Sequence, residues 1–92
     1  MSKRYGTVQN IDLVLKTKIY TVTLPQGTRS YMIKTRGNTE FKIGFVSDLA
    51  SYITIPSGSA EAEDDIFSEG PIVLYVQGEV DAEVLEVKAW EG

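Results

Sequence analysis

Hydrophobic and polar residues alternate along most of this chain with a period of two, the period of a β-strand that buries one face. The alternating segments are rich in Val, Ile, Thr, Tyr and Phe, and clusters of Gly, Pro, Asn, Ser and Asp separate them. No window has the spacing of an amphipathic helix of useful length. Strands are therefore expected at residues 7–15, 18–24, 29–36, 40–46, 51–55, 72–77 and 80–90.

Residues 60–65 are expected to form either a short edge strand or a loop. The fold class that follows is all-β, a small β-sandwich or jelly roll (or a barrel) of seven or eight short, mostly antiparallel strands. In the strand expected at residues 40–46, Phe41, Ile43 and Phe45 face inward and Lys42 faces solvent.

Two of the later strands depart from simple alternation. Residues 72–77 are apolar at both even and odd positions, which predicts a strand buried on both faces or covered on one face by a neighbouring subunit. In residues 80–90 the apolar positions change from even to odd, which predicts a β-bulge near Val84-Leu85 or a strand that bends between two sheets.

One turn pattern occurs twice along the chain. Residues 24–28, Leu-Pro-Gln-Gly-Thr, match residues 55–59, Ile-Pro-Ser-Gly-Ser, and each segment ends one expected strand and precedes another. The repeat indicates either a duplicated half-fold, as in two facing Greek keys, or one turn solution used twice.

A length of 92 residues indicates one small domain with a thin core. We describe residues 1–16 as an N-terminal arm or first strand and residues 17–92 as the β-sandwich domain. The chain has no cysteine and no histidine, so oligomerisation or docking onto a larger body is the external support left to it. We expect no signal peptide, because no apolar run follows the two basic residues near the amino terminus, and no transmembrane segment.

Charge is distributed unevenly over the sequence. Eight of the nine basic residues lie at or before Lys42, and eleven of the thirteen acidic residues follow it. This distribution predicts either a dipolar molecule whose copies attract one another or, if the two halves share sheets, a surface on which the charges mix.

The chain lacks most of the residue types that enzymes commonly use for catalysis. Without histidine or cysteine, and without a glycine-rich phosphate loop, the sequence favours a protein that is not an enzyme and binds no cofactor. A pair of carboxylates, as in glycosidases, is the catalytic alternative.

The acidic run at residues 61–69 lacks the spacing of a calcium loop and is interpreted as a solvated loop or a protected edge strand. The negative net charge and the alternation of Phe41 with Lys42 argue against nucleic-acid binding.

The order of several motifs resembles that in small virion proteins of tailed bacteriophages. These motifs are the two turns described above, Thr-Arg-Gly at 35–37 and Leu-Tyr-Val-Gln at 74–77, followed by an acidic and apolar last strand; the resemblance covers roughly residues 17–90. Such proteins are β-sandwich or jelly-roll domains of the head-decoration and minor capsid kind. The resemblance implies a non-enzymatic homo-oligomer, with a trimer favoured, on the capsid surface of a virion, where it stabilises the shell by binding the major capsid or another virion protein.

The residues that would contact such partners are of two kinds. Basic residues of the first third would meet an acidic capsid surface, and aromatic residues of the last two strands would pack against sister copies. The candidates are Lys3, Arg4, Lys16, Arg29, Arg36, Tyr75 and Trp90. The alternative function is a carbohydrate-binding β-sandwich that mediates surface attachment, in which Tyr52, Tyr75 and Trp90 would stack on sugar rings.

Overall fold

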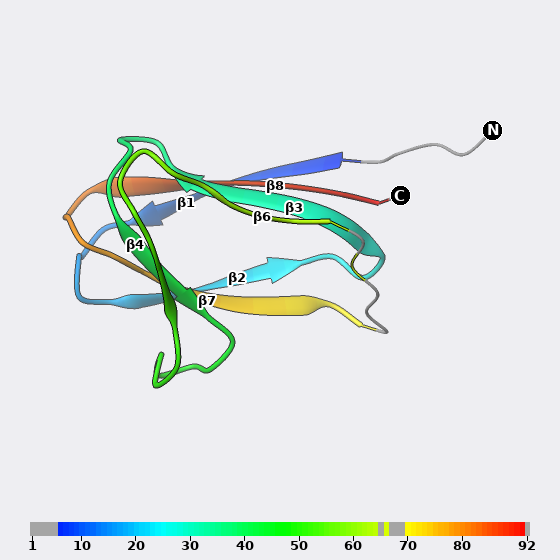
Figure 1. Ribbon diagram of the computed structural model, residues 1–92, viewed down its shortest axis with the longest axis horizontal. Helices are drawn as coiled ribbons and strands as arrows, with labels where there is room; N and C mark the ends of the chain where they lie inside the picture. Colours follow the sequence, from blue (N-terminus) through cyan, green and yellow to red (C-terminus); the bar gives the residue numbers. More distant parts are fainter. Residues whose placement is uncertain (1–5, 65, 67–69, 92) are drawn as a thin grey trace.

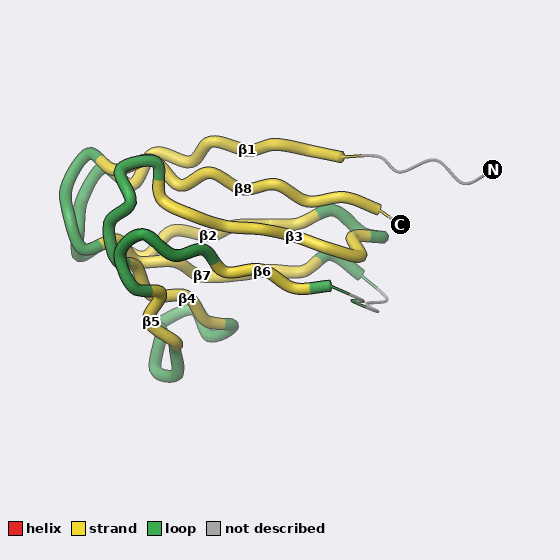
Figure 2. Tube along the Cα trace, turned by 45° about the horizontal axis from the view of Figure 1, so that its top comes forward, coloured by secondary structure: helices red, strands yellow, loops and turns green. Residues whose placement is uncertain are grey.

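The strands form two four-stranded sheets that face each other (Figures 1 and 2). The structure is a computed structural model that describes residues 6–64, 66 and 70–91. Sheet I has the order β1 (Gly6–Leu13), β8 (Glu83–Glu91), β3 (Thr28–Thr35) and β6 (Glu61–Glu63). Sheet II has the order β2 (Ile19–Leu24), β7 (Ile72–Gly78), β4 (Phe41–Gly44) and β5 (Ile53–Ile55).

This strand order is that of an eight-stranded jelly roll. Every paired strand in the described part of the chain is antiparallel to its neighbour. Apart from the hairpin that joins β4 to β5, each connection carries the chain from one sheet to the other. The expected all-β class is therefore confirmed, and the strand order makes the sandwich a jelly roll. Residues 61–63 form an edge strand, one of the two forms expected for that segment.

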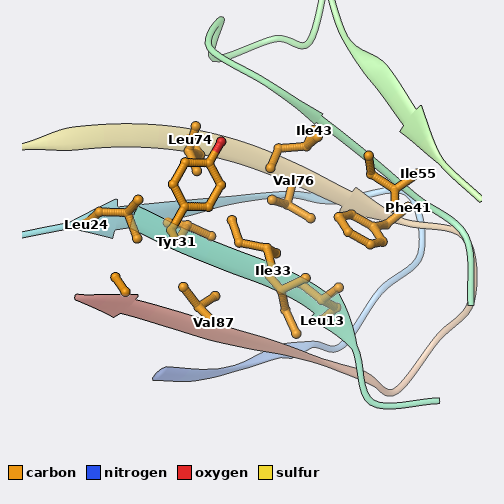
Figure 3. Packing of buried hydrophobic residues seen from close by; sticks show 13 residues of the cluster. Leu13, Leu24, Tyr31, Ile33, Phe41, Ile43, Ile55, Leu74, Val76 and Val87 are labelled. Carbon is orange, nitrogen blue, oxygen red and sulfur yellow. The ribbon is translucent and has the colours of Figure 1, made fainter. Parts of the chain in front are cut away.

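The core fills the space between the two sheets with aliphatic side chains and two aromatic rings (Figure 3). The alternation predicts these positions well, since Tyr31, Ile33 and Thr35 are all buried, as are Val22 and Leu24 on β2. The cluster of buried hydrophobic residues consists of Leu13, Val22, Leu24, Tyr31, Ile33, Phe41, Ile43, Ile55, Leu74, Val76, Leu85, Val87 and Ala89.

Strand β7 is a central strand with one buried face. Leu74 and Val76 point into the core, whereas Val73 on the outer face is 38% exposed and Tyr75 is half-buried. The expectation of burial on both faces is therefore wrong for the described part of the chain, because Val73 on the outer face is exposed there. Cover by a neighbouring subunit stays a prediction.

The first and last strands are shorter than expected. Strand β1 ends at Leu13, and Val14 and Leu15 are more than half exposed where the chain turns toward β2. Strand β8 begins at Glu83, so Val80 and Ala82 lie before it, and Ala82 has a φ of 57° in the turn. The change of parity in residues 80–90 is thus the boundary between turn and strand. The two expected explanations, a bulge near Val84-Leu85 and a strand that bends between the sheets, are therefore both wrong. Strand β8 pairs with β1 in continuous register and stays in sheet I, and the register shift of this sheet lies in β3, between Thr28 and Ser30.

The two turns of matching sequence also have matching geometry. The N–H of Thr28 donates to the carbonyl of Pro25 at 3.2 Å, and the equivalent bond to Pro56 is 3.1 Å. Gly27 and Gly58 occupy the third position with φ of 92° and 80°, where glycine is free of steric cost. The turns join β2 to β3 and β5 to β6, a shift of three strands, whereas a duplicated half-fold would repeat after four. The repeat is therefore one turn solution used twice.

Glu83 is a buried carboxylate, 7% exposed, beside the turn that follows β3. It accepts hydrogen bonds from the N–H of Gly37 at 2.9 Å, the N–H of Val84 at 2.9 Å and the hydroxyl of Thr39. Burial raises the pKa of this carboxyl, but the hydrogen bonds from Thr39, Val84 and Gly37, with the charge of Arg36, outweigh burial and hold the pKa below its usual value. The ionised side chain thus holds the β3–β4 turn against the start of β8.

Candidate functional site

An apolar cleft of about 300 Å³ opens at one end of the core, where the edge of sheet I faces the β4–β5 hairpin of sheet II. Its lining comes from five strands, β3 to β7, and from the loop that joins β4 to β5. Figure 3 shows the ring of Tyr31 crossing the space between the sheets toward Leu74, with Ile43 nearby. The lining residues are Tyr31, Ile43, Gly44, Phe45, Val46, Ser51, Tyr52, Ile53, Glu61 and Leu74.

The rim of the cleft exposes four large apolar side chains. Phe45 is 73% exposed, Ile53 54%, Tyr52 50% and Val46 43%. The sequence pattern expected Phe45 to be buried with Phe41 and Ile43, and this expectation is wrong. Strand β4 ends at Gly44, and the chain then enters the hairpin turn, where the N–H of Leu49 donates to the carbonyl of Val46. Phe45 therefore lies beyond the end of the strand, outside the space that the two sheets enclose.

The sheet I side of the cleft is acidic. Strand β6 pairs with β3 in a register that places Glu63 opposite Tyr31 and Glu61 opposite Ile33. Because Tyr31 and Ile33 are core residues, residues opposite them lie on the inward face of the sheet. Two carboxylates thus occupy inward positions on β6, and Ala62 occupies the outward one.

The pKa values at the cleft reflect this arrangement. Burial, followed by the charges of Glu61 and Glu63, raises the pKa of the Tyr31 hydroxyl to about 12. Burial also raises the pKa of Glu61, with a smaller contribution from Glu63, and a hydrogen bond from the backbone of Ala62 partly offsets the rise. Both shifts therefore have the same causes, partial burial at the cleft and the negative charge of β6.

Among the basic residues expected to form the partner surface, Arg36 has side-chain partners within the chain, whereas Lys16 is held through its backbone. The backbone N–H of Lys16, in the β1–β2 loop, donates to Asp81 at 2.9 Å. The guanidinium of Arg36 lies 3.0 Å from the carboxylate of Glu86 and donates to Asn10 at 3.3 Å. Arg36 therefore belongs to a polar cluster on the outer face of sheet I.

The other expected contact residues that the structure describes, Arg29, Tyr75 and Trp90, do not come together on one surface. Arg29 lies near the start of β3, at the opposite end of that strand from Arg36. Tyr75 lies on the outer face of sheet II, whereas Trp90 lies on the outer face of sheet I, with the ammonium of Lys88 5.3 Å from its ring centre. Lys3 and Arg4 lie outside the described residues.

The charges of the two sequence halves mix in the fold. Lys34 and Arg36 each form an ion pair with Glu86, and Lys42 lies 3.7 Å from Glu79. Each pair joins a basic residue of the first half to an acidic residue of the second. Of the two charge distributions that the sequence left open, the structure shows the mixed one at these positions.

No group of three or more acidic side chains in residues 6–64, 66 and 70–91 is placed to hold a metal ion. Part of the acidic run at 61–69, including Asp65 and Glu69, lies outside these residues. The same described ranges contain no helix of the length and hydrophobicity that crossing a bilayer requires.

Fold and site together define a small jelly-roll domain with an apolar cleft at one open edge. The chain is similar over 98% of its length to all of a de novo designed double-stranded β-helix solved by NMR in solution, with a TM-score of 0.53 and 12% sequence identity. A likeness at this identity shows the fold alone. No protein-family model matches the chain, and no curated protein matches it.

The cleft could not be recognised in the sequence, because none of the residues that line it is unusual in type. A signal was nevertheless present at residues 60–63, where Ala-Glu-Ala-Glu alternates like a strand. When β6 pairs with β3, the acidic positions of this alternation lie opposite the core residues Tyr31 and Ile33. An ordinary sandwich strand would place its apolar positions there.

Proposed function

We propose that this chain is a non-enzymatic structural protein of a virion, which decorates the capsid of a tailed bacteriophage and stabilises it by binding shell subunits. The observation that carries the proposal is the group of exposed apolar side chains Phe45, Val46, Tyr52 and Ile53 around the cleft. A contiguous apolar patch beside a cleft is typical of a surface that a partner covers. The resemblance of the turn and strand motifs to phage decoration proteins supports the identity of that partner.

The proposed contact surface differs from the one expected from charge. Arg36 forms its ion pair within the chain, and Tyr75 and Trp90 lie on opposite outer faces. The cleft edge, by contrast, gathers its apolar residues from one hairpin, so a single partner segment can cover them all.

A homo-oligomer, with a trimer favoured, is part of the same proposal. A chain of 92 residues buries a smaller share of its surface than a larger domain does, and association compensates for this. The outer face of β7, with Val73 38% exposed and Tyr75 half-buried, supports contact with a sister copy. Sedimentation equilibrium of the purified chain measures the mass directly, and a monomer at every concentration tested would overturn this part.

The proposal is tested on particles. The chain should be detected by mass spectrometry and by antibody labelling in purified particles of the virus that encodes it. Particles assembled without the chain should then bind the recombinant protein. The double variant Phe45→Ser, Ile53→Ser should lose this binding, whereas Val8→Ser, at a 70% exposed aliphatic position on β1, should retain it. Absence of the chain from particles contradicts the proposal, as does equal loss of binding in the control.

Carbohydrate binding is the second candidate, and the exposed ring of Tyr52 is the observation that favours it. Tyr52 and Tyr75 belong to the sheet II side of the sandwich, whereas Trp90 belongs to sheet I, so the three rings do not form one platform. A glycan array probed with the chain and with Tyr52→Ala tests this function. Binding that is lost in Tyr52→Ala and unchanged in Trp90→Ala would support it.

A further inference from the structure

Strand β6 presents its two carboxylates on the face that a β-sandwich normally fills with apolar side chains. Glu61 and Glu63 lie opposite Ile33 and Tyr31, and Glu61 is half-buried at the wall of the cleft. Both carboxylates act on Tyr31, since each raises the pKa of its hydroxyl. Glu61 therefore places a negative charge at the wall of the cleft, and the exposed side chain of Glu63 adds to the negative potential beside it.

Inward-pointing charge on an edge strand has a known structural use, because it discourages pairing with strands of other chains. That use accounts for the two carboxylates but not for what lies across from them. The opposite wall is apolar, and the exposed rings of Phe45 and Tyr52 form part of its rim. A site built of an apolar wall, aromatic rings and carboxylates has the chemistry that recognises a cation on an apolar stem.

We infer that the cleft binds an arginine or lysine side chain that a partner protein presents beside an apolar residue. The apolar stem and its neighbour contact Ile43, Phe45 and Ile53, and the cationic head lies near Glu61 and Glu63. The inference rests on the proposed function, since it specifies the chemistry of the shell segment that covers the cleft.

One ring that lines the cleft already contacts an ammonium group of the same chain. The ammonium of Lys42, whose neighbours Phe41 and Ile43 face the core, lies 5.0 Å from the centre of the Tyr52 ring. The carboxylate of Glu79 lies 3.7 Å from that ammonium and offsets its charge. The ring of Tyr52 is therefore already within cation–π distance of one ammonium group.

Peptide probes test the inference on the intact chain by NMR. The first probe is acetyl-Leu-Arg-Leu-amide, and the matched probe replaces arginine by citrulline, which has nearly the same shape and no charge. The arginine peptide should shift backbone amide signals of β6 and of the β4–β5 hairpin, with a dissociation constant about fivefold lower than that of the citrulline peptide. A third probe with glutamate in the central position should bind more weakly than either.

Variants separate the contributions of charge and apolar contact. The double variant Glu61→Gln, Glu63→Gln should bind the arginine and citrulline peptides equally, whereas Asp12→Asn, on β1, should keep the preference. Ile53→Ala should weaken the binding of both peptides, and Val8→Ala should weaken the binding of neither. Thermal melting curves establish that each variant is folded.

The outcomes distinguish this inference from the proposed function. Equal binding of the arginine and citrulline peptides, signal shifts outside the cleft, or no saturable shift with the arginine peptide would each overturn the inference. Particle binding that persists in Glu61→Gln, Glu63→Gln but is lost in Phe45→Ser, Ile53→Ser would leave the proposed function standing and the inference refuted. Arginine-selective binding at the cleft by a chain that is absent from particles would refute the proposed function alone.

Discussion

The backbone N–H of Gly37 donates a hydrogen bond of 2.9 Å to the carboxylate of Glu83, which lies 46 residues further along the chain. The same carboxylate accepts hydrogen bonds from the hydroxyl of Thr39 and the N–H of Val84. A charged group with these donors around it fixes the β3–β4 turn to β8, so one side chain joins two parts of the molecule that are distant in sequence.

Glu83→Gln should lower the free energy of unfolding at neutral pH by about 1–3 kcal/mol. The substitution removes the charge and replaces one oxygen, which accepts hydrogen bonds, by an amide nitrogen, which cannot. The pKa of Glu83 is lower in the folded chain than in the unfolded chain, so its stabilisation is fully present above the unfolded pKa and is lost as the pH falls through the folded pKa. Urea unfolding of both proteins over the acid range measures this. The difference between them should shrink toward low pH, and Glu40→Gln, at an exposed position, serves as the control.

Gly44→Ala should destabilise the protein by about 1–3 kcal/mol through overpacking. A Cβ at this position would lie 2.5 Å from the backbone oxygen of Ser51 and 3.1 Å from a methyl group of Leu49, so the hairpin would have to move. Gly70→Ala is the matched control, since a Cβ there would meet no atom within 4 Å. Chemical denaturation checks both, and equal stability of the two variants would contradict the close approach at Gly44.

Much of the fold follows from the alternation of apolar and polar residues, because a strand that buries one face must have an apolar residue at every second position. Phe41 and Ile43 on β4 and the inward residues of β2 and β3 are core residues as expected. The pattern fails where strands end. Phe45 and Val80 continue an apolar alternation beyond the hydrogen-bonded ladder, and only the position of the turn decides whether such residues are covered.

The candidate site could be predicted less well than the fold, because it depends on pairing register. Glu61 and Glu63 read as solvated acids until β6 is placed beside β3, when both lie opposite core residues. For the basic residue Arg36, the sequence overstates how available its charge is to a partner. Arg36 reads as a free cation in the sequence, but the fold brings Glu86 to 3.0 Å from it. Neither relationship is encoded by residues that are near each other in the chain.

Leu74→Ala should destabilise the protein by about 2–5 kcal/mol, whereas Val73→Ala should cost less than about 1 kcal/mol. The two residues are neighbours on β7, but Leu74 is 1% exposed in the core and Val73 is 38% exposed on the outer face. Urea denaturation of the monomeric state gives both values. If the chain associates through the outer face of β7, Val73→Ala should in addition weaken association, which sedimentation equilibrium detects.

The hydroxyl of Tyr31 should titrate with a pKa of about 12, because burial and then the charges of Glu61 and Glu63 disfavour the phenolate. The ultraviolet difference between the titration curves of the native chain and Tyr31→Phe isolates this group. Since its pKa is raised in the folded state, the stabilisation that it contributes is fully present below the unfolded pKa of about 10 and is lost as the pH rises through about 12. The native chain should therefore lose more stability than Tyr31→Phe over this window. Replacing both carboxylates in Glu61→Gln, Glu63→Gln should lower the pKa of Tyr31 part of the way toward its ordinary value, because burial remains, and an unchanged pKa would show that the two charges do not act on this hydroxyl.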